Sequence, residues 1–459
     1  MEENKERIIQ TDQGREHGQT KCPKCGSTEI ALNPKTGKLR CLFCRNEFEP
    51  EKFEELETDI VHLEGEIIGS GAADIQADAD DQIVTLKCSS CGAEVVIDSN
   101  TQTQARCHWC RNILSLNKQI RNGAVPDAVL PFKVNKKEAK ECIEQFVGKR
   151  QLFAHPKFKE EFTADNVMGV YLPYMVIDAN AHASFGGQGE IESRQYTRKE
   201  NDKEKTYYDA KLYNVGREFD LAVEGLTVES SQDKLDVHSR ERTNNIINSI
   251  MPFDTENCVR WNANYLHGYT SEKRDVNVEQ LSPVVQKQCE EIAKDRVNET
   301  ISQYDRGVRW DSRNLVFKGR QWKSAYLPVW LYSFQEEKND QKIIHYVAVN
   351  ARTRETMGSI PIYKPKLLLF SAAIELVGLI AALILHFTVF DQGQWYPWLL
   401  LLPGFIYYLV IHNKYRNSAA VHHYVKETKC NVSNLEKQDT FVKERTGLDS
   451  PAMEGANNR

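Results

Sequence analysis

Eight of the twelve cysteines in this chain occur in four C-x-x-C pairs. A C-x-x-C turn brings two thiolates to one metal ion, and a second such turn further along the chain completes a tetrahedral site. Fifteen residues separate the first pair from the second, and fifteen separate the third from the fourth. The spacing predicts two four-cysteine metal sites, formed by Cys22, Cys25, Cys41 and Cys44, and by Cys88, Cys91, Cys107 and Cys110.

Four sulfur ligands occupy every position around a tetrahedral zinc ion and leave none open for water. We therefore expect two structural Zn²⁺ ions and no catalysis at either site. The alternative is that the pairs are redox dithiols or disulfides, but the shared two-pair spacing is typical of zinc sites. His108 lies inside the last pair and is a candidate substitute for a cysteine ligand, although we expect it to face solvent.

The two cysteine units are copies of one another. All four positions of the first unit recur after a shift from Cys22 to Cys88, together with several residues around them. Such a repeat indicates an internal duplication. Between the pairs, Glu29–Leu32 and Glu94–Ile97 have the composition of short strands. Each unit is therefore predicted to be a small β zinc ribbon.

The charge of the ribbon region favours protein partners over nucleic acid. Residues 1–120 contain 14 lysines and arginines against 21 acidic residues, a net charge of −7. Each zinc tetrathiolate centre adds about −2 more. An acidic module forgoes the phosphate contacts that dominate non-specific nucleic-acid affinity. A local basic strip keeps nucleic acid as an alternative partner: Lys35, Lys38, Arg40 and Arg45.

Two apolar runs near the end of the chain predict a membrane hairpin. Leu367–Phe387 has the length that a helix needs to cross about 30 Å of hydrocarbon. Trp395–Ile411 is at the short end of that range, and Pro403 should kink it. A buried hairpin of a soluble domain is the alternative.

The charges around the two runs predict their orientation. The loop between the runs contains Asp391 and no basic residue. By the positive-inside rule both termini lie in the cytoplasm, at the inner face of the cell membrane. A reducing cytoplasm also keeps the cysteine thiolates free for metal. Basic residues flank the outer ends of the hairpin at Lys364, Lys366, Lys414 and Arg416.

Glu375 lies in the middle of the first run, where an ionisable group is costly and normally faces another helix. Small residues share its helical face at Ser371, Gly378 and Ala382. We expect this face to be a packing seam, within the hairpin or in a homo-oligomer. A proton-relay or ion-path carboxylate is the alternative, but the two runs contain no second acidic group to support it.

The segment between the ribbons and the hairpin has mixed helix and strand patterns. Lys136–Lys149 has apolar residues on one helical face, and Gln288–Gln303 is a predicted surface helix. Tyr171–Asp178 begins with Tyr-Leu-Pro, and Tyr326–Ser333 repeats that motif. We therefore predict two related α+β modules. The tail after Arg416 is expected to begin with a helix from Ser418 to Glu427 and to end in a disordered polar segment through Arg459.

No sequence motif predicts catalysis. The chain has no P-loop, no H-E-x-x-H, no G-x-S-x-G and no kinase motif. The four remaining cysteines are scattered, and we expect none of them to be a nucleophile. We therefore expect a protein that is not an enzyme.

Five segments of the chain carry a family resemblance: VTLKCSSCGAEVVID, ARCHWCRN, NGAVPDAVLPFKV, GVYLPYMVIDAN and AYLPVWLYSF. Together they resemble a family of bacterial membrane proteins that contain transcription-factor-IIB-type zinc ribbons, and the resemblance runs from the first ribbon through the hairpin. Some members carry labels borrowed from primosomal helicases, which do not suit a chain without an ATPase loop. The resemblance implies an adaptor that works with flotillin-like or phage-shock-like membrane proteins, and it maps only the eight ribbon cysteines onto this chain.

The sequence therefore predicts a multidomain α+β protein with two N-terminal β zinc ribbons, a duplicated α+β cytoplasmic body and one transmembrane hairpin. Its predicted function is a membrane-anchored adaptor that binds protein partners at the bilayer surface. A membrane-tethered nucleic-acid-binding regulator is the alternative. The predicted boundaries are a flexible N-terminus at 1–20, ribbon 1 at 21–58, a linker at 59–84, ribbon 2 at 85–120, modules at 125–235 and 236–365, the hairpin at 367–411 and a partly disordered cytoplasmic tail at 412–459.

Overall fold

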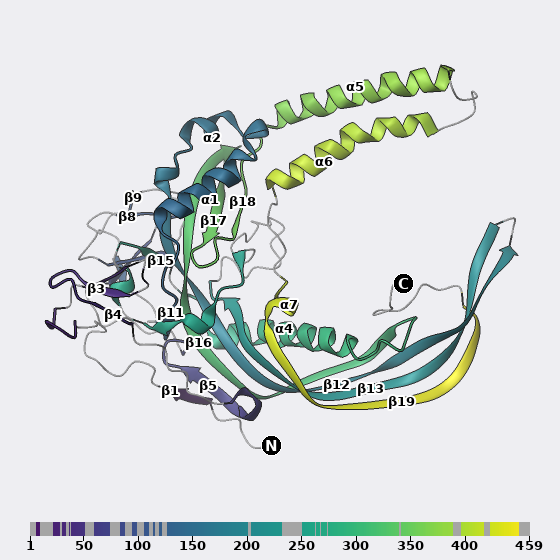
Figure 1. Ribbon diagram of the computed structural model, residues 1–459, viewed down its shortest axis with the longest axis horizontal. Helices are drawn as coiled ribbons and strands as arrows, with labels where there is room; N and C mark the ends of the chain where they lie inside the picture. Colours follow the sequence, from purple (N-terminus) through teal and green to yellow (C-terminus); the bar gives the residue numbers. More distant parts are fainter. Residues whose placement is uncertain are drawn as a thin grey trace.

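The protein is a mixed α+β fold built around one large sheet, which agrees with the predicted class (Figure 1). Among the described residues, fourteen strands join this sheet, and the two cysteine units predicted as ribbons contribute small sheets of three and two strands. The computed structural model describes residues 6–9, 22–27, 30–33, 36, 38–50, 59–73, 83–87, 94–98, 105–109, 113–114, 119–121, 126–200, 203–231, 250–261, 263–266, 268–272, 274–338, 341–388, 396–416 and 423–448.

The elements follow one another with most of the short strands in the first third of the chain. The strands are β1 Glu6–Ile9, β2 Ile30–Leu32, β3 Leu39–Cys41, β4 Glu47–Phe48, β5 Gly65–Gly69, β6 Ile83–Lys87, β7 Glu94–Asp98, β8 Ala105–Arg106, β9 Ile113–Leu114, β10 Gln119–Arg121, β11 Ala128–Val129, β12 Met168–Glu200, β13 Lys203–Glu229, β14 Val259–Arg260, β15 Thr270–Glu272, β16 Val308–Lys338, β17 Gln341–Asn350, β18 Thr356–Gly358 and β19 Lys429–Leu448. The α-helices are α1 Lys136–Gly148, α2 Pro156–Glu161, α4 Val278–Asn298, α5 Lys364–Thr388, α6 Leu402–Arg416 and α7 Tyr424–Glu427. The 3-10 turns are η1 Ile60–His62, η3 Gln151–Phe153, η4 Ala164–Asn166, η6 Thr255–Asn257, η7 Ala263–Leu266 and η8 Tyr396–Leu401.

The two Tyr-Leu-Pro segments lie side by side at the centre of the sheet. β12 and β16 pair antiparallel, and the register places Leu172 opposite Leu327. Both leucines are buried. An apolar strand of this kind needs a neighbour on its open edge. The two predicted modules therefore share one sheet.

Helix α1 confirms the predicted helix to within one residue at its end. Asn135 and Glu138 form a capping box that satisfies the first free N–H groups of the helix. Ile143 and Phe146 lie on the buried face, which packs into the same core as β16 and β17. This helix and α2 follow each other along one side of the body (Figure 1).

A curved arm extends from the body, formed by the far ends of β12, β13 and β16 with β19 at the edge (Figure 1). Helix α4 covers one face of the arm, where Val285 and Ile292 pack in the same cluster as Ala181 and Ala183. The predicted surface helix at Gln288–Gln303 is this helix, shifted toward the N-terminus. Its start is set by a capping box at Asn277 and Gln280 that the periodicity alone does not reveal.

The C-terminal segment corrects one prediction. β19 pairs with β13 from Glu224–Lys429 to Tyr208–Leu448, so the expected disorder is wrong for this stretch. Most side chains of β19 are exposed. An edge strand completes backbone hydrogen bonds with its neighbour while its charged side chains stay in water. Because its composition is polar, the sequence did not indicate this strand.

Two segments before the body also differ from their expected roles. The predicted flexible N-terminus contributes β1, and the predicted linker contributes β5. Asp127 holds the linker in place, because its carboxylate accepts hydrogen bonds from the backbone N–H groups of Gly71 (2.6 Å) and Ser324 (2.8 Å). These strands extend the large sheet beyond β16.

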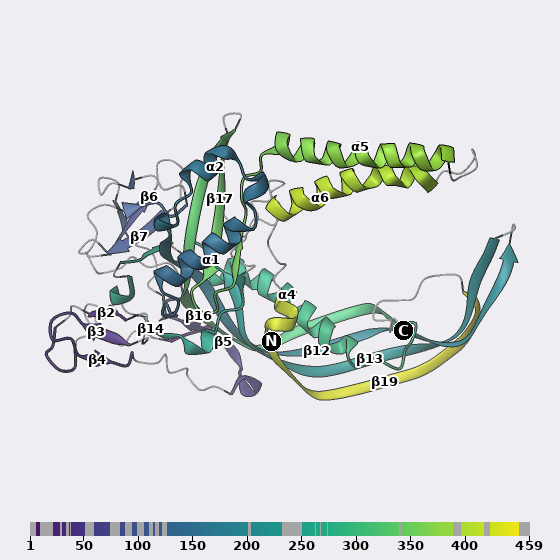
Figure 2. The same cartoon turned by 45° about the horizontal axis from the view of Figure 1, so that its top comes forward.

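The C-terminal apolar runs form a helical hairpin that projects from the body (Figure 2). Among the described residues, α5 is the one helix whose length and composition suit a membrane span. The second run forms η8 and then α6, so the expected break falls next to Pro403. A Cβ atom at Gly404 would lie 2.3 Å from Oε2 of Glu375, and Ala382 is fully buried. The predicted packing seam is therefore confirmed within the hairpin.

Candidate metal centre

The first ribbon positions its four cysteines on two loops of a three-stranded sheet. Cys22 and Cys25 precede β2, whereas Cys41 ends β3 and Cys44 follows it. β2 and β3 pair with Ile30 opposite Cys41. The short hairpin thus folds the second cysteine pair back onto the first.

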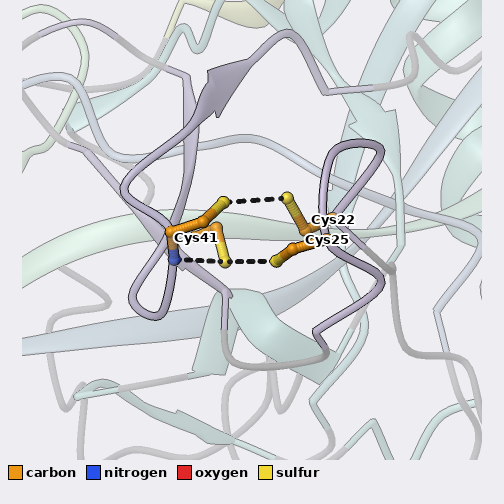
Figure 3. A group of neighbouring side chains, drawn as sticks. Cys22, Cys25 and Cys41 are labelled. Atoms are coloured by element: carbon orange, nitrogen blue, oxygen red, sulfur yellow. Dashed lines mark hydrogen bonds between the residues drawn. The ribbon is translucent and has the colours of Figure 1, made fainter.

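The four sulfur atoms form one compact group. Cys22 Sγ lies 3.6 Å from Cys44 Sγ, and Cys25 Sγ lies 3.6 Å from Cys41 Sγ. All four Sγ atoms lie within 4.8 Å of one another. Zinc–sulfur bonds of about 2.3 Å in a tetrahedron place the sulfurs about 3.8 Å apart. Figure 3 shows the two loops facing each other across this group, which can hold one metal ion.

The two loops share one backbone geometry. The N–H of Gly26 donates to the carbonyl of Cys22 at 2.8 Å, and the N–H of Arg45 donates to the carbonyl of Cys41 at 2.9 Å. Gly26 and Arg45 both have left-handed backbones, with φ of 72° and 59°. Gly26 of the first turn therefore has Arg45 as its counterpart in the second.

The thiols of the first site differ in pKa. The backbone N–H of Cys44 is the main cause that lowers the pKa of Cys41 to about 6. The backbone N–H of Ser27 lowers the pKa of Cys25. Burial and the neighbouring thiols together outweigh it and raise this pKa to about 12. A cluster of this kind cannot hold four thiolates without a cation. Metal binding must therefore release protons.

One side of the first ribbon is docked on the body and the other side is open. Ile30 and Leu39 are buried in the same cluster as Leu266 of η7. Inside the second cysteine pair, Leu42 is 50% exposed and Phe43 is 77% exposed. The sequence contains a signal for this surface, because two large apolar residues lie within one four-residue turn. The spacing of the cysteines does not indicate it.

Two of the four cations of the basic strip, Lys38 and Arg40, form surface ion pairs. Lys38 Nζ lies 2.9 Å from Glu49, and Arg40 Nε lies 3.9 Å from Glu47. The hydrogen bond and charge of Glu49 raise the pKa of Lys38. Lys35, the fourth cation of the strip, lies outside the described residues.

The second predicted site is described only in part. Cys88, Cys91 and Cys110 lie outside the described residues, whereas Cys107 is fully buried. His108 is 1% exposed, so its expected contact with solvent is wrong.

Tertiary packing explains the burial of His108. β7 of this unit pairs with β15, and the next residue after His108, Trp109, stacks edge-on against Tyr346 at 5.4 Å between ring centroids. His108 Nε2 then lies 4.0 Å from Oε2 of Glu272, at the end of β15. The body thus covers a side chain that an isolated ribbon would expose.

Two of the cysteines outside the ribbons, Cys258 and Cys289, have thiols with raised pKa values. Burial raises the pKa of Cys258 and of Cys289 to about 12, which keeps both thiols protonated. Cys258 also lines a pocket of about 390 Å³, together with the ion pair of Lys323 and Asp178 at 2.9 Å and several other polar residues.

Comparisons with known proteins give one relative. The chain is similar to an uncharacterised protein, YdjG of Bacillus subtilis (strain 168), with 23% identity over 349 residues that cover 75% of this chain and 91% of YdjG. No family model matches the chain, and no solved structure matches it.

Proposed function

We propose that this protein is a membrane-anchored adaptor, without catalysis, that binds protein partners through its zinc ribbons at the cytoplasmic face of the bilayer. The observation that carries the proposal is the exposure of Leu42 and Phe43 on the tip of the first ribbon. Large apolar side chains held rigidly on a surface are typical anchors of protein interfaces. A metal ion in the four-cysteine site would fix the backbone on both sides of this tip.

The proposal includes a structural role for zinc. The four cysteines of the first ribbon would hold it, and a closed tetrahedral thiolate site supplies folding energy to a small unit with little core. We extend the same role to Cys88, Cys91, Cys107 and Cys110, which gives two ions per chain. The close relation of the two sequence units supports this extension.

The hairpin supports the membrane anchor. α5 has the length and hydropathy of a spanning helix. The packed seam joins it to η8 and α6, which we propose as a second, shorter span. Basic residues at both outer ends support a cytoplasmic location for the two termini. Membrane-associated proteins, of the flotillin-like or phage-shock-like kinds that the family resemblance implies, are then the proposed partners. A second copy of the chain is a further proposed partner.

A membrane-tethered nucleic-acid-binding regulator is the second candidate. An exposed aromatic such as Phe43 beside Arg45 suits the stacking of a single-stranded base. The paired states of Lys38 and Arg40 oppose this candidate, because cations held by glutamates contribute less to phosphate binding.

The test is a mild-detergent pull-down of the tagged full-length protein with a Leu42→Ser, Phe43→Ser variant, at matched membrane levels. Val316→Ser on the arm is the control, because Val316 is also an exposed apolar residue, remote from the ribbon. We expect a defined membrane protein with the native chain and with the control, and at least a tenfold loss with the double variant. Retention of nuclease-sensitive nucleic acid instead, lost in the double variant, would replace the adaptor with the regulator.

A further inference from the structure

We propose that the segment Lys149–Glu161, which contains η3 and α2, is a second membrane contact that docks on anionic lipid headgroups. The inference rests on the proposed membrane anchor and goes beyond it, because this segment lies more than 200 residues before the hairpin in the sequence. Its tertiary position, exposed leucine and charge carry the inference together.

The segment is bound to the root of the hairpin. The N–H of Tyr363, one residue before α5, donates to the carbonyl of Phe153 at 2.8 Å. The hydroxyl of Tyr415, near the end of α6, accepts from the N–H of Phe153 at 3.2 Å. The ring of Phe153 also packs against Phe370 at 5.4 Å between centroids. Both ends of the hairpin therefore meet at η3, and a bilayer that holds the hairpin brings its headgroups to this level.

One apolar side chain of the segment has no role in the body. Phe153 is buried under the hairpin root, whereas the preceding Leu152 is 52% exposed. The first turns of α5 expose Leu368 and Leu369 in the same way. A lone exposed leucine is ordinary on a soluble surface. At the entry point of a spanning helix, the same leucine can insert into the boundary between headgroups and acyl chains.

The charge at the hairpin root is opposite to that of the chain. The ranges 149–161, 363–366 and 412–416 contain eight lysines and arginines against two glutamates, whereas the whole chain has a net charge of −6. Lys157 and Lys159 of α2 are exposed. Lys157 contacts Glu161 at 3.9 Å on the surface, a pair that water screens.

This combination selects an anionic bilayer as the occupant. Each lysine near a negatively charged leaflet favours the bound state about fivefold. Cations and an apolar side chain that adjoin a membrane insertion point are the two features of an interfacial segment. Docking of this segment would fix the body against the bilayer, which the two chain connections at the hairpin root do not achieve alone.

The experiment places an environment-sensitive fluorescent amino acid at position 152, 369 or 316 of the full-length chain. Each labelled protein is reconstituted into vesicles whose lipids have brominated acyl chains, which quench a fluorophore that enters the bilayer. One set of vesicles contains phosphatidylglycerol and phosphatidylcholine, and the other contains phosphatidylcholine alone. We expect quenching at 369 in both sets, quenching at 316 in neither, and quenching at 152 in the anionic set. The docked fraction reported at 152 should fall at least fivefold without phosphatidylglycerol or with Lys157→Glu and Lys159→Glu.

A matched control is Lys437→Glu with Lys443→Glu on β19, two exposed lysines of the arm that should leave the signal at 152 unchanged. Quenching at 369 without quenching at 152 would overturn the second contact and leave the anchor intact. Equal quenching at 152 in neutral vesicles would also overturn it, because anionic lipid would then have no part. Absence of quenching at 369 would remove the membrane anchor itself.

Discussion

At the residue scale, the two cysteine turns of the first ribbon adopt the same backbone conformation with different residues. Gly26 and Arg45 occupy equivalent positions after the second cysteine of each pair, and both have positive φ. A left-handed backbone costs glycine little, but it costs other residues about 1–2 kcal/mol. The carbonyl of Cys41 accepts the N–H of Arg45, and the sulfur of Cys41 accepts the N–H of Cys44 at 3.4 Å. The same turn therefore occurs twice, once with a glycine, which adopts a positive φ readily, and once with an arginine, which does not.

The ligand role of Cys41 can be tested by Cys41→Ser. The substitution removes one of four thiolates, so we expect the zinc content to fall by one ion per chain and the first ribbon to lose its fold, because structural zinc supplies its stability. The measurement is zinc released on denaturation, with protease sensitivity of residues 22–50. Cys142→Ser on α1 is the control, since Cys142 is remote from the sulfur group, and it should retain all zinc. Unchanged zinc in Cys41→Ser would exclude this metal centre.

At the element scale, β19 depends on ion pairs with strands and turns distant in sequence. Arg217 of β13 is fully buried, and its guanidinium lies 2.5 Å from Asp439 of β19. Arg445 of β19 lies 2.7 Å from Glu190 of β12, which is also buried. Buried charges are costly without partners. The strand therefore completes the charge balance of the arm as well as its hydrogen bonds.

The pair of Arg217 and Asp439 predicts acid sensitivity. Burial acts to raise the pKa of Asp439, but Arg217 outweighs it and the pKa is lowered. A lowered pKa stabilises the fold above the pKa of the unfolded chain, about 3.9, and this stability is lost as the pH falls toward the folded value. Asp439→Asn should cost about 1–3 kcal/mol at pH 7, because it leaves buried Arg217 without its counter-charge.

The measurement is urea unfolding followed through the arm at pH 7 and below pH 4. The Asn variant should lose less stability on acidification than the native chain does. Asp311→Asn is the control, because Asp311 pairs with Arg309 at 3.0 Å on the surface and should cost less than about 1 kcal/mol. An equal cost for both variants would show that the buried pair does not hold β19.

At the scale of the whole molecule, the hairpin and the arm extend from the body in the same direction (Figures 1 and 2). The far end of the arm is rich in charge, with the segment Arg194–Glu200 as an example. Charged side chains and open strand edges are not tolerated in hydrocarbon. A bilayer that takes up the hairpin therefore excludes the arm, and insertion requires the arm to move away from the hairpin while the contacts of η3 with the hairpin root stay in place.

This divergence is measurable by spin-label distances between positions 387 on α5 and 441 on β19. In lipid nanodiscs we expect a distribution longer than the separation of these positions in the structure. A label pair at 316 and 441, both on the arm, is the control and should match the structure, because the arm moves as one sheet. A distribution centred on the structural separation for the first pair would place the hairpin outside the bilayer.

Local patterns account for the parts of the protein that the sequence predicts well. The spacing of Cys22, Cys25, Cys41 and Cys44 depends on two short turns and one small hairpin, so it predicts their convergence. The start of α1 is encoded by its own cap, and the seam at Glu375 by helical periodicity. Each of these features needs only neighbours in sequence or a single partner helix.

Tertiary structure alone decided the rest. β19 is polar because it lies at an edge, and only the presence of β13 makes it a strand. His108 is buried because β15 and Tyr346 arrive from distant segments. The docking of Phe153 joins η3 to the hairpin root across more than 200 residues. Composition and spacing determine which residues can bind metal or enter a bilayer, whereas long-range pairing determines which surfaces stay open for partners.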